Sequence, residues 1–184
     1  MGKEIIIVTI SLGNDGAERI LTELARQWHH DGHRITVIQT SPNRYGTEYA
    51  LPEGIEQIQI HTTSSNKILR FLQEIKALIG ILKQRPNATC LSFLSASSFI
   101  LAISSWFVKN RMVFSERNNP RKVPVGKHQQ ILRNFAFRFA DAIVFQTEDA
   151  KSYFSKSIQS RGHIIPNPIN GNLPEPYEGE REKI

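Results

Sequence analysis

Residues 5–38 read IIIVTISLGNDGAERILTELARQWHHDGHRITVI, and this stretch carries the clearest signal of the fold class. Residues 5–10 form a continuous, mostly β-branched run, which is typical of a strand buried on both faces. Residues 17–30 carry apolar side chains at helical spacing, and Asp31-Gly32 ends that helix before a second apolar run at residues 35–38. This strand–helix–strand pattern predicts parallel strands joined by a right-handed crossover.

The same alternation continues to residue 165. Further strands are expected at residues 55–60, 88–93, 111–115, 142–145 and 163–165, and further helices at residues 67–84, 96–107, 127–140 and 148–157. We therefore predict an α/β domain with a Rossmann-like, doubly wound, mostly parallel sheet over residues 1–165. Residues 166–184 are rich in proline, glycine and charge, and we expect them to form a linker towards a second domain.

Composition excludes several classes of protein. The chain has 184 residues, of which 40% are hydrophobic and 22% charged, as in ordinary globular domains and unlike disordered chains. The single cysteine excludes a disulfide framework and a cysteine zinc cluster, and it is compatible with a reducing cytosol. No apolar run approaches the length of a membrane span, and the N-terminus does not resemble a signal peptide. The six histidines lack metal-ligand spacing, so we predict no metal site.

The net charge of +6 belongs to one segment of the chain. Residues 109–138 carry +7, and the remainder of the chain carries −1. The basic residues of this segment are Lys109, Arg111, Arg117, Arg121, Lys122, Lys127, Arg133 and Arg138. Such a concentration of positive charge favours a phosphate-bearing ligand, a nucleic acid or an anionic membrane surface.

The first candidate site is the loop at residues 11–16, between the first strand and the first helix. Gly13 and Gly16 leave backbone N–H groups accessible at a helix start, where an anion can bind. The loop is not a G-x-G-x-x-G motif and no acidic residue ends the second strand, so NAD binding is disfavoured. A tight turn with Asp15 as the helix N-cap and Glu18 in the first turn explains the same residues equally well.

The second candidate site is SERNNP at residues 115–120, directly after a predicted strand. Glu116 and Arg117 are suited to bind hydroxyls and a phosphate, and Asn118 and Asn119 offer both donors and acceptors. The alternative is a solvated loop with an internal ion pair. A third polar group, around Thr147, is better explained as the N-cap of the helix that follows.

The helix expected at residues 67–84 allows two interpretations. A stripe at helical spacing predicts packing on the sheet, and it consists of Ile68, Leu72, Ile75, Ile79 and Leu82. Phe71 and Ile81 lie outside this stripe and close to basic residues. The second interpretation is therefore that this helix contacts the surface of an anionic bilayer.

Four short segments in the same order resemble family 4 glycosyltransferases. They are GAERIL at 16–21, SERNNP at 115–120, RFADAIV followed by QTE within 138–148, and IIPNPI at 164–169. Asp15 replaces a glycine that the family carries before its Gly-Ala-Glu-Arg sequence. The family consists of retaining enzymes with the two-domain GT-B architecture, and the resemblance covers the first domain. SERNNP resembles a loop of members that build bacterial surface polysaccharides, such as capsules.

The resemblance implies transfer of a sugar from a nucleotide-sugar, above all a UDP-sugar, to a saccharide or lipid-linked saccharide acceptor. The donor is a substrate, so no cofactor is expected. The loop facing the donor diphosphate and sugar would comprise Gly13, Asn14, Asp15, Gly16 and Ala17, and the acceptor side would comprise Glu116, Arg117, Asn118 and Asn119. Many members carry a histidine near these acceptor-side residues, and this chain does not.

The resemblance also implies that the paired glutamates and the diphosphate clamp of the family belong to the second domain. We therefore expect residues 1–184 alone to be inactive. A cytoplasmic location is expected, with peripheral contact to the anionic inner face of the plasma membrane as one option. Arg121, Lys122 and Lys127 are expected to contact either a phosphate or this membrane surface.

Two alternatives to an enzyme domain remain. One is a non-enzymatic module that binds an acceptor or a polyanion. The other is a nucleic-acid-binding protein, which is less favoured because the chain has no recognisable motif for it and the phenylalanines near the basic residues follow core spacing. We therefore predict no nucleic-acid partner.

Overall fold

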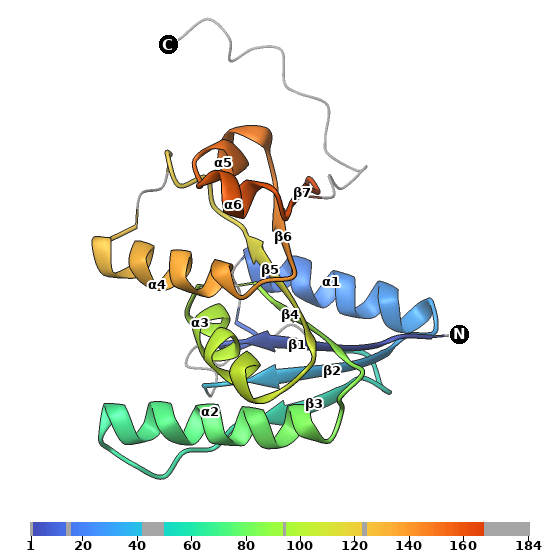
Figure 1. Ribbon diagram of the computed structural model, residues 1–184. Helices are drawn as coiled ribbons and strands as arrows, with labels where there is room; N and C mark the ends of the chain where they lie inside the picture. The colour runs from blue at the N-terminus through green and yellow to red at the C-terminus, as the bar shows by residue number, and fades with distance from the viewer. Residues whose placement is uncertain (1, 14–15, 42–49, 94, 123–124, 168–184) are drawn as a thin grey trace, which may run out of the picture.

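The computed structural model describes residues 2–13, 16–41, 50–93, 95–122 and 125–167. In this part of the chain, seven strands form one parallel sheet in the order β3-β2-β1-β4-β5-β6-β7 (Figure 1). The strands are β1 (Glu4–Thr9), β2 (Arg34–Gln39), β3 (Glu56–Gln59), β4 (Thr89–Ser92), β5 (Arg111–Glu116), β6 (Ala142–Phe145) and β7 (Gly162–Ile164). The predicted Rossmann-like, doubly wound architecture is confirmed.

Helices cover both faces of the sheet. They are α1 (Gly16–His30), α2 (Lys67–Lys83), α3 (Ser95–Ser104) with the short 3-10 helix η1 (Ser105–Phe107), α4 (Lys127–Arg138), α5 (Glu148–Ser152) and α6 (Lys156–Gln159). Figure 1 shows α1 on one side of the sheet and α2, α3 and α4 on the other. Because both faces are covered, the central strand β1 reads as a nearly continuous apolar run in the sequence.

Side chains of β1 contribute to two hydrophobic cores, one on each face of the sheet. Ile6 and Val8 belong to the core beneath α2, α3 and α4, whereas Ile7 belongs to the core beneath α1. All three side chains are fully buried. The alternation follows from the pleat of a strand, in which successive side chains point to opposite faces.

Two expected helices differ in the structure. The helix expected at residues 148–157 is divided into α5 and α6, because Phe154 turns into the core and packs on Phe137 and Phe145 at ring-centroid distances of 5.4 Å and 5.2 Å. The expectation of one continuous helix is therefore wrong. Thr147 does cap α5, since its Oγ1 accepts a hydrogen bond from the N–H of Ala150 at 3.1 Å.

The predicted core stripe of α2 holds only for the second half of the helix. Ile75 and Leu82 are buried in the core with the sheet. Ile68 and Leu72 are 71% and 54% exposed, so their expected packing is wrong. Only the C-terminal half of α2 contributes fully buried side chains, and the N-terminal half presents apolar side chains to solvent.

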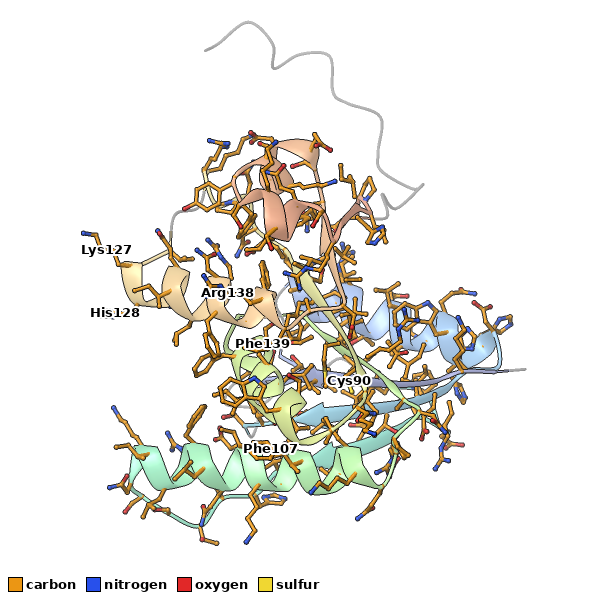
Figure 2. All side chains as sticks on the ribbon, in the orientation of Figure 1. Cys90, Phe107, Lys127, His128, Arg138 and Phe139 are labelled. Atoms are coloured by element: carbon orange, nitrogen blue, oxygen red, sulfur yellow. The ribbon has the colours of Figure 1, made fainter. Side chains whose placement is uncertain are left out.

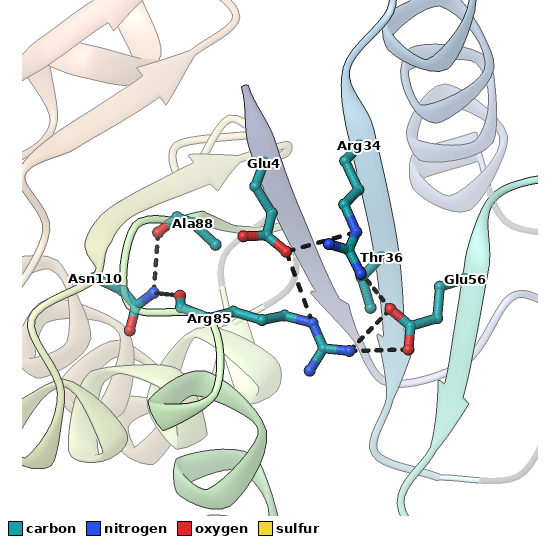
Figure 3. A network of polar contacts seen from close by, with 7 residues as sticks. All are labelled: Glu4, Arg34, Thr36, Glu56, Arg85, Ala88 and Asn110. Atoms are coloured by element: carbon teal, nitrogen blue, oxygen red, sulfur yellow. Dashed lines mark hydrogen bonds and ion pairs between the residues drawn. The ribbon is translucent and has the colours of Figure 1, made fainter. Parts of the chain in front are cut away.

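A polar network ties together the amino edge of the sheet, the edge where the strands begin (Figure 3). The Nη2 of Arg85 lies 2.9 Å from both carboxylate oxygens of Glu56 at the start of β3. Thr36 donates a hydrogen bond to the same carboxylate, and Glu4 of β1 lies 3.8 Å from the Nε of Arg85. Burial alone would raise the pKa of Glu56, but Thr36 and Arg85 together hold it below the usual value.

The sheet reaches the end of the predicted first domain. The N–H of Ile165 donates a hydrogen bond to the carbonyl oxygen of Phe145, which extends the pairing of β7 with β6 by one residue. The predicted linker begins at residue 166, and most of it, residues 168–184, lies outside the described residues.

Candidate functional site

The topology places the candidate site at the carboxyl edge of the sheet, the edge where the strands end. The chain proceeds from β1 to β2 and β3 on one side, whereas β4 to β7 lie on the other side of β1. β1 therefore pairs with β2 and with β4, and the strand order reverses between β1 and β4. In open α/β sheets a ligand crevice forms beyond the carboxyl ends of the strands at such a reversal.

The loop after β1 closes against the first turn of α1. Ser11 Oγ donates a hydrogen bond of 3.3 Å to Glu18 Oε1, and the Glu18 side chain is buried. A Cβ atom placed on Gly13 would lie 2.9 Å from Glu18 Oε2, so only glycine fits this approach without a shift. Gly16 begins α1 and is exposed, with Ala17 half-buried behind it. The loop thus brings a helix N-terminus to the carboxyl edge beside β4.

Asn14 and Asp15 lie outside the described residues. The expected N-cap role of Asp15 falls on one of them and stays a prediction. The remaining members, Gly13, Gly16 and Ala17, lie together at the carboxyl edge, as expected from the end of a strand.

The buried Glu116 side chain holds the start of the SERNNP loop, residues 115–120, against α4. Its Oε2 accepts a hydrogen bond of 3.2 Å from Nη1 of Arg133, and its Oε1 accepts one of 3.1 Å from the N–H of Asn118. Glu116 and Arg133 are both almost fully buried. Burial raises the pKa of Glu116, although Arg133 and the Asn118 N–H oppose the shift. The ion pair that the sequence allowed within the loop is in fact a buried pair with α4.

Arg117 joins the ends of three strands. It follows β5, and its guanidinium lies 5.1 Å from the ring centroid of Phe93 after β4. Its Nη2 donates a hydrogen bond to Oδ1 of Asn167 beyond β7, and Gln146 after β6 donates to the same oxygen at 3.3 Å. Burial lowers the pKa of Arg117. Its half-buried charge lies where an anionic or hydroxyl-rich ligand would meet the sheet.

The remaining residues of the second loop are divided between protein contacts and solvent. Asn119 Nδ2 donates a hydrogen bond of 2.6 Å to Asp149 at the start of α5, and Arg121 Nε lies 3.3 Å from the same carboxylate group. Asn118 and Lys122 are exposed. Lys127 is also exposed, in the first turn of α4 (Figure 2). Arg121 is therefore engaged in an ion pair, whereas Lys122 and Lys127 extend into solvent, and their contact with a phosphate or a membrane stays a prediction.

The structure reveals a hydroxyl cluster that the sequence interpretation missed. Ser92 ends β4, and its Oγ lies 2.7 Å from Ser97 Oγ and 3.1 Å from Ser98 Oγ, all three buried. The cluster lies at the first turn of α3, next to the reversal of strand order. The signal available in the sequence was SFLSASS at residues 92–98, a serine-rich segment directly after a predicted strand.

A polar pocket of about 270 Å³ opens at the same edge, beyond β2 and β3. Its hydroxyl-bearing and charged lining includes Thr40, Ser41, Thr62, Arg70 and Glu74. Burial raises the pKa of Glu74, while Arg70 acts in the opposite direction. The pocket's hydroxyl, guanidinium and carboxyl groups can donate and accept hydrogen bonds with a ligand that carries hydroxyl groups. Sequence reasoning missed this pocket because its walls come from three separate segments.

An apolar pocket of about 280 Å³ lies on the α1 side, below Arg117. Leu24 and Trp28 of α1 face Val113 and Val144 across it. Ser115 Oγ, also in its wall, is buried with no hydrogen-bond partner among the described residues. A wider depression of about 620 Å³ lies at the far end of α1, at the amino edge and away from the loops described above.

Within the described residues, no group of three or more His, Cys, Asp or Glu side chains is placed to hold a metal ion. Cys90 lies inside β4 in the core (Figure 2), and burial raises the pKa of its thiol to about 12. A thiol with such a pKa is protonated at neutral pH and is a poor nucleophile. In the described part of the chain, no helix is long and apolar enough to cross a membrane.

Several solved structures share this fold. Anabaena Alr3699/HepE in complex with UDP and glucose has a TM-score of 0.69 and 14% sequence identity, and the match covers 91% of this chain and 45% of that chain. The lipopolysaccharide outer core galactosyltransferase WaaB, in its apo form, has a TM-score of 0.69 at 12% identity, with coverages of 91% and 46%. Sucrose-phosphate synthase from Thermosynechococcus elongatus has a TM-score of 0.69 at 6% identity, with coverages of 89% and 48%.

The chain thus spans less than half the length of these solved structures. A search of curated proteins finds no significant match to the sequence. The sequence profile of Glycosyltransferase Family 4, however, matches residues 14–172, from the loop after β1 to beyond β7. The match includes every segment of the carboxyl edge from Gly16 to Asn167. The chain therefore belongs to glycosyltransferase family 4.

Proposed function

We propose that the chain is the acceptor-side domain of a retaining glycosyltransferase. In this proposal a sugar passes from a nucleotide-sugar, above all a UDP-sugar, to a saccharide or lipid-linked saccharide in polysaccharide biosynthesis. The proposal rests above all on the match to the glycosyltransferase family model. The carboxyl edge of the matched sheet also brings together the Gly13 loop, Arg117 and the polar pocket. The HepE complexes with UDP and with UDP-glucose support a nucleotide-sugar donor.

The loop after β1 is assigned to the donor side. Gly13, Gly16 and Ala17 lie at or just before the start of α1, where the N–H groups of the first turn have no partner within the helix. Such groups and the positive end of the helix stabilise the negative charge that develops on a departing diphosphate. We assign the nucleotide itself, the paired glutamates and the diphosphate clamp to a second Rossmann-like domain of the whole protein. The donor is a substrate, and the proposal requires no cofactor.

The acceptor side is assigned to Arg117, Asn118 and the polar pocket. Arg117 presents a half-buried charge, and the exposed Asn118 offers both donors and acceptors to hydroxyl groups. The pocket contributes hydroxyls together with Arg70 and Glu74. Glu116 is assigned a supporting role, because its carboxylate oxygens are engaged by Arg133 and the loop backbone.

The non-enzymatic alternatives receive less support from the geometry. Arg133 is buried and Arg121 is paired with Asp149, so the basic segment does not present all of its charge to a polyanion. Phe114 and Phe137 lie in the core and offer no ring faces for stacking on bases. A nucleic-acid partner is therefore not proposed.

Amide chemical shifts of the 15N-labelled chain test this assignment. UDP and a panel of monosaccharides at millimolar concentration are expected to shift amides of residues 11–17, 92–98 and 117–118, and those that line the polar pocket. Amides at the amino edge, such as those of Glu4 and Arg34, serve as the internal control and should not move. Shifts confined to the amino edge, or no shifts with any of these compounds, would contradict the proposal.

A further inference from the structure

An apolar surface covers the outer side of the α2, α3 and α4 layer. We call it the apolar face, and it consists of the exposed large side chains Ile68, Leu69, Leu72, Trp106, Phe107, Ile131 and Leu132. Ile68 and Ile131 are 71% and 66% exposed, and Trp106 is 60% exposed. Soluble monomers rarely gather so many large apolar side chains on one surface unless it binds something.

A chain of aromatic rings makes this face continuous across the helices. Phe71 of α2 stacks on Phe99 of α3 at 5.8 Å between ring centroids, and Phe99 contacts Phe135 of α4 at 5.7 Å. Phe135 contacts Phe139 at 5.0 Å, and Phe139 contacts Trp106 at 5.5 Å. The half-buried rings fix the positions of the exposed side chains around them, so the face is preformed.

The helices that carry the apolar face have almost only positive charges. The exposed cationic side chains of α2 and α4, and those between η1 and the first residue of β5, are Lys67, Arg70, Lys76, Lys83, Lys127, Arg138, Lys109 and Arg111. Figure 2 shows Lys127 and His128 extending from the first turn of α4 and Arg138 near its other end. Glu74 is the one acidic residue in the sequence of α2, α3, η1 and α4, and it is half-buried beside Arg70.

The face continues to the carboxyl edge of the sheet. α2 and α4 both follow loops from that edge, so Ile68, Leu69 and Ile131 lie near the edge where the substrate site is proposed. Arg70 lines the polar pocket, while Leu69 and Leu72 on neighbouring positions of the helix are exposed. One helix therefore connects the apolar face with a pocket for hydroxyl-rich ligands.

We propose that the apolar face binds the surface of an anionic bilayer. Apolar side chains would enter the boundary between headgroups and acyl chains, and the surrounding lysines and arginines would contact anionic headgroups. The positive charge argues for this occupant, because a second copy of the chain would bring like charges together. One consequence of this binding rests on the proposed function. If the acceptor is lipid-linked and held in the bilayer, it would reach the polar pocket at the carboxyl edge.

The two tryptophans of the chain provide matched reporters for this surface. Trp106 lies on the apolar face, and Trp28 packs against the core on the α1 side of the sheet. In the Trp28→Phe variant, vesicles containing 30% phosphatidylglycerol should shift Trp106 emission to shorter wavelength, and brominated lipids should quench it. In the Trp106→Phe variant, the emission of Trp28 should not change. Quenching of Trp28 equal to that of Trp106 would overturn the proposed orientation.

Sedimentation with vesicles measures the binding itself. The chain should bind phosphatidylglycerol vesicles and not neutral phosphatidylcholine vesicles. Each positive charge lost near the membrane should weaken binding about fivefold. The double variant Lys127→Glu with Arg138→Glu should therefore bind at least 20-fold more weakly. The control pair, Arg26→Glu with Lys156→Glu, makes the same charge change away from the face and should bind within about threefold of the unchanged chain, because interactions beyond the Debye length are screened.

Removal of apolar side chains separates insertion from general charge attraction. Ile68→Ser with Ile131→Ser should reduce binding to phosphatidylglycerol vesicles at least tenfold while circular dichroism shows the fold unchanged. The proposal fails if binding is absent, is equal for neutral and anionic vesicles, or survives these substitutions. It also fails if the chain dimerises and the serine variants dissociate the dimer, because a second copy would then occupy the face. Vesicle binding can be measured without sugar transfer. A chain that binds vesicles but transfers no sugar would therefore contradict only the proposed function, and a chain that does not bind vesicles would contradict only the membrane proposal.

Discussion

Nη1 of Arg133 lies 3.2 Å from Oε2 of Glu116, in a pair whose side chains are 2% and 6% exposed. The pair connects the end of β5 with α4 and supports the loop that begins with Arg117. The Arg133 guanidinium also lies 4.8 Å from the ring centroid of Phe154. Arg133, which belongs to the basic segment at residues 109–138, is thus part of the interior and is not available to a ligand.

Removal of Arg133 should destabilise the fold strongly. The Arg133→Met substitution leaves the Glu116 carboxylate buried without its guanidinium, and we expect the free energy of unfolding to fall by about 3–5 kcal/mol. Urea denaturation followed by circular dichroism measures this change. The control is Arg138→Met, at an exposed position of the same helix, which should change the free energy of unfolding by less than about 0.5 kcal/mol. Equal effects of the two substitutions would contradict the buried pair.

The raised pKa of Glu116 should give a characteristic pH dependence. The folded protein holds the Glu116 proton more tightly than the unfolded chain, whose carboxyl keeps its ordinary pKa of 4.5. The stability contributed by Glu116 therefore falls as pH rises from about 4.5 through the higher folded pKa. We expect the stability of the unchanged chain relative to Glu116→Gln to decrease over this interval. Urea titrations between pH 4 and 8 measure it, and an increase with pH would be inconsistent with burial as the dominant cause.

Glu56 should show the opposite sign. Its pKa is held below the ordinary 4.5, so its stabilising contribution is complete above that pH and is lost as pH falls through the lower folded pKa. Because the Glu56 side chain is 43% exposed, the effect of Glu56→Gln at pH 7 should be only about 0.5–1 kcal/mol. Unfolding measured from pH 2.5 to 6 should show the difference disappear towards the acid end. A difference that persists at pH 2.5 would show that charge is not its origin.

The two glycines of the loop after β1 should respond differently to alanine. At Gly13 the new Cβ would lie 2.9 Å from Glu18 Oε2 and would displace the carboxylate from Ser11, at a cost of about 1 kcal/mol for the lost hydrogen bond. At Gly16, the first residue of α1, a Cβ meets nothing within 4 Å, and alanine should raise stability by up to about 1 kcal/mol. Thermal unfolding of the two variants measures the contrast. A stabilising Gly13→Ala substitution would show that the loop is not closed against Glu18.

Sequence reasoning recovered the elements whose pattern is local. The run at residues 5–10, the glycine at position 32 and the threonine cap at position 147 each carry their own signal. The structure confirms the strand, the helix end and the helix start that they predict. Features that depend on tertiary contact were missed. The charge of Arg133 does not reveal its burial, and the spacing of Ile68 does not show that the first half of α2 packs away from the core. The walls of the polar pocket come from segments far apart in the sequence, so no local pattern predicts it.

The assignment of residues 1–184 to one domain of a retaining glycosyltransferase is tested by measuring sugar transfer for this stretch and, side by side, for the protein at the length its gene encodes. Radiolabelled UDP-glucose, UDP-galactose and UDP-N-acetylglucosamine are supplied with a bacterial lipid extract as acceptor. We expect transfer with retained anomeric configuration by the gene-length protein, and no transfer by residues 1–184. Turnover by residues 1–184, transfer with inversion, or no transfer by the gene-length protein from any of these donors would contradict this assignment.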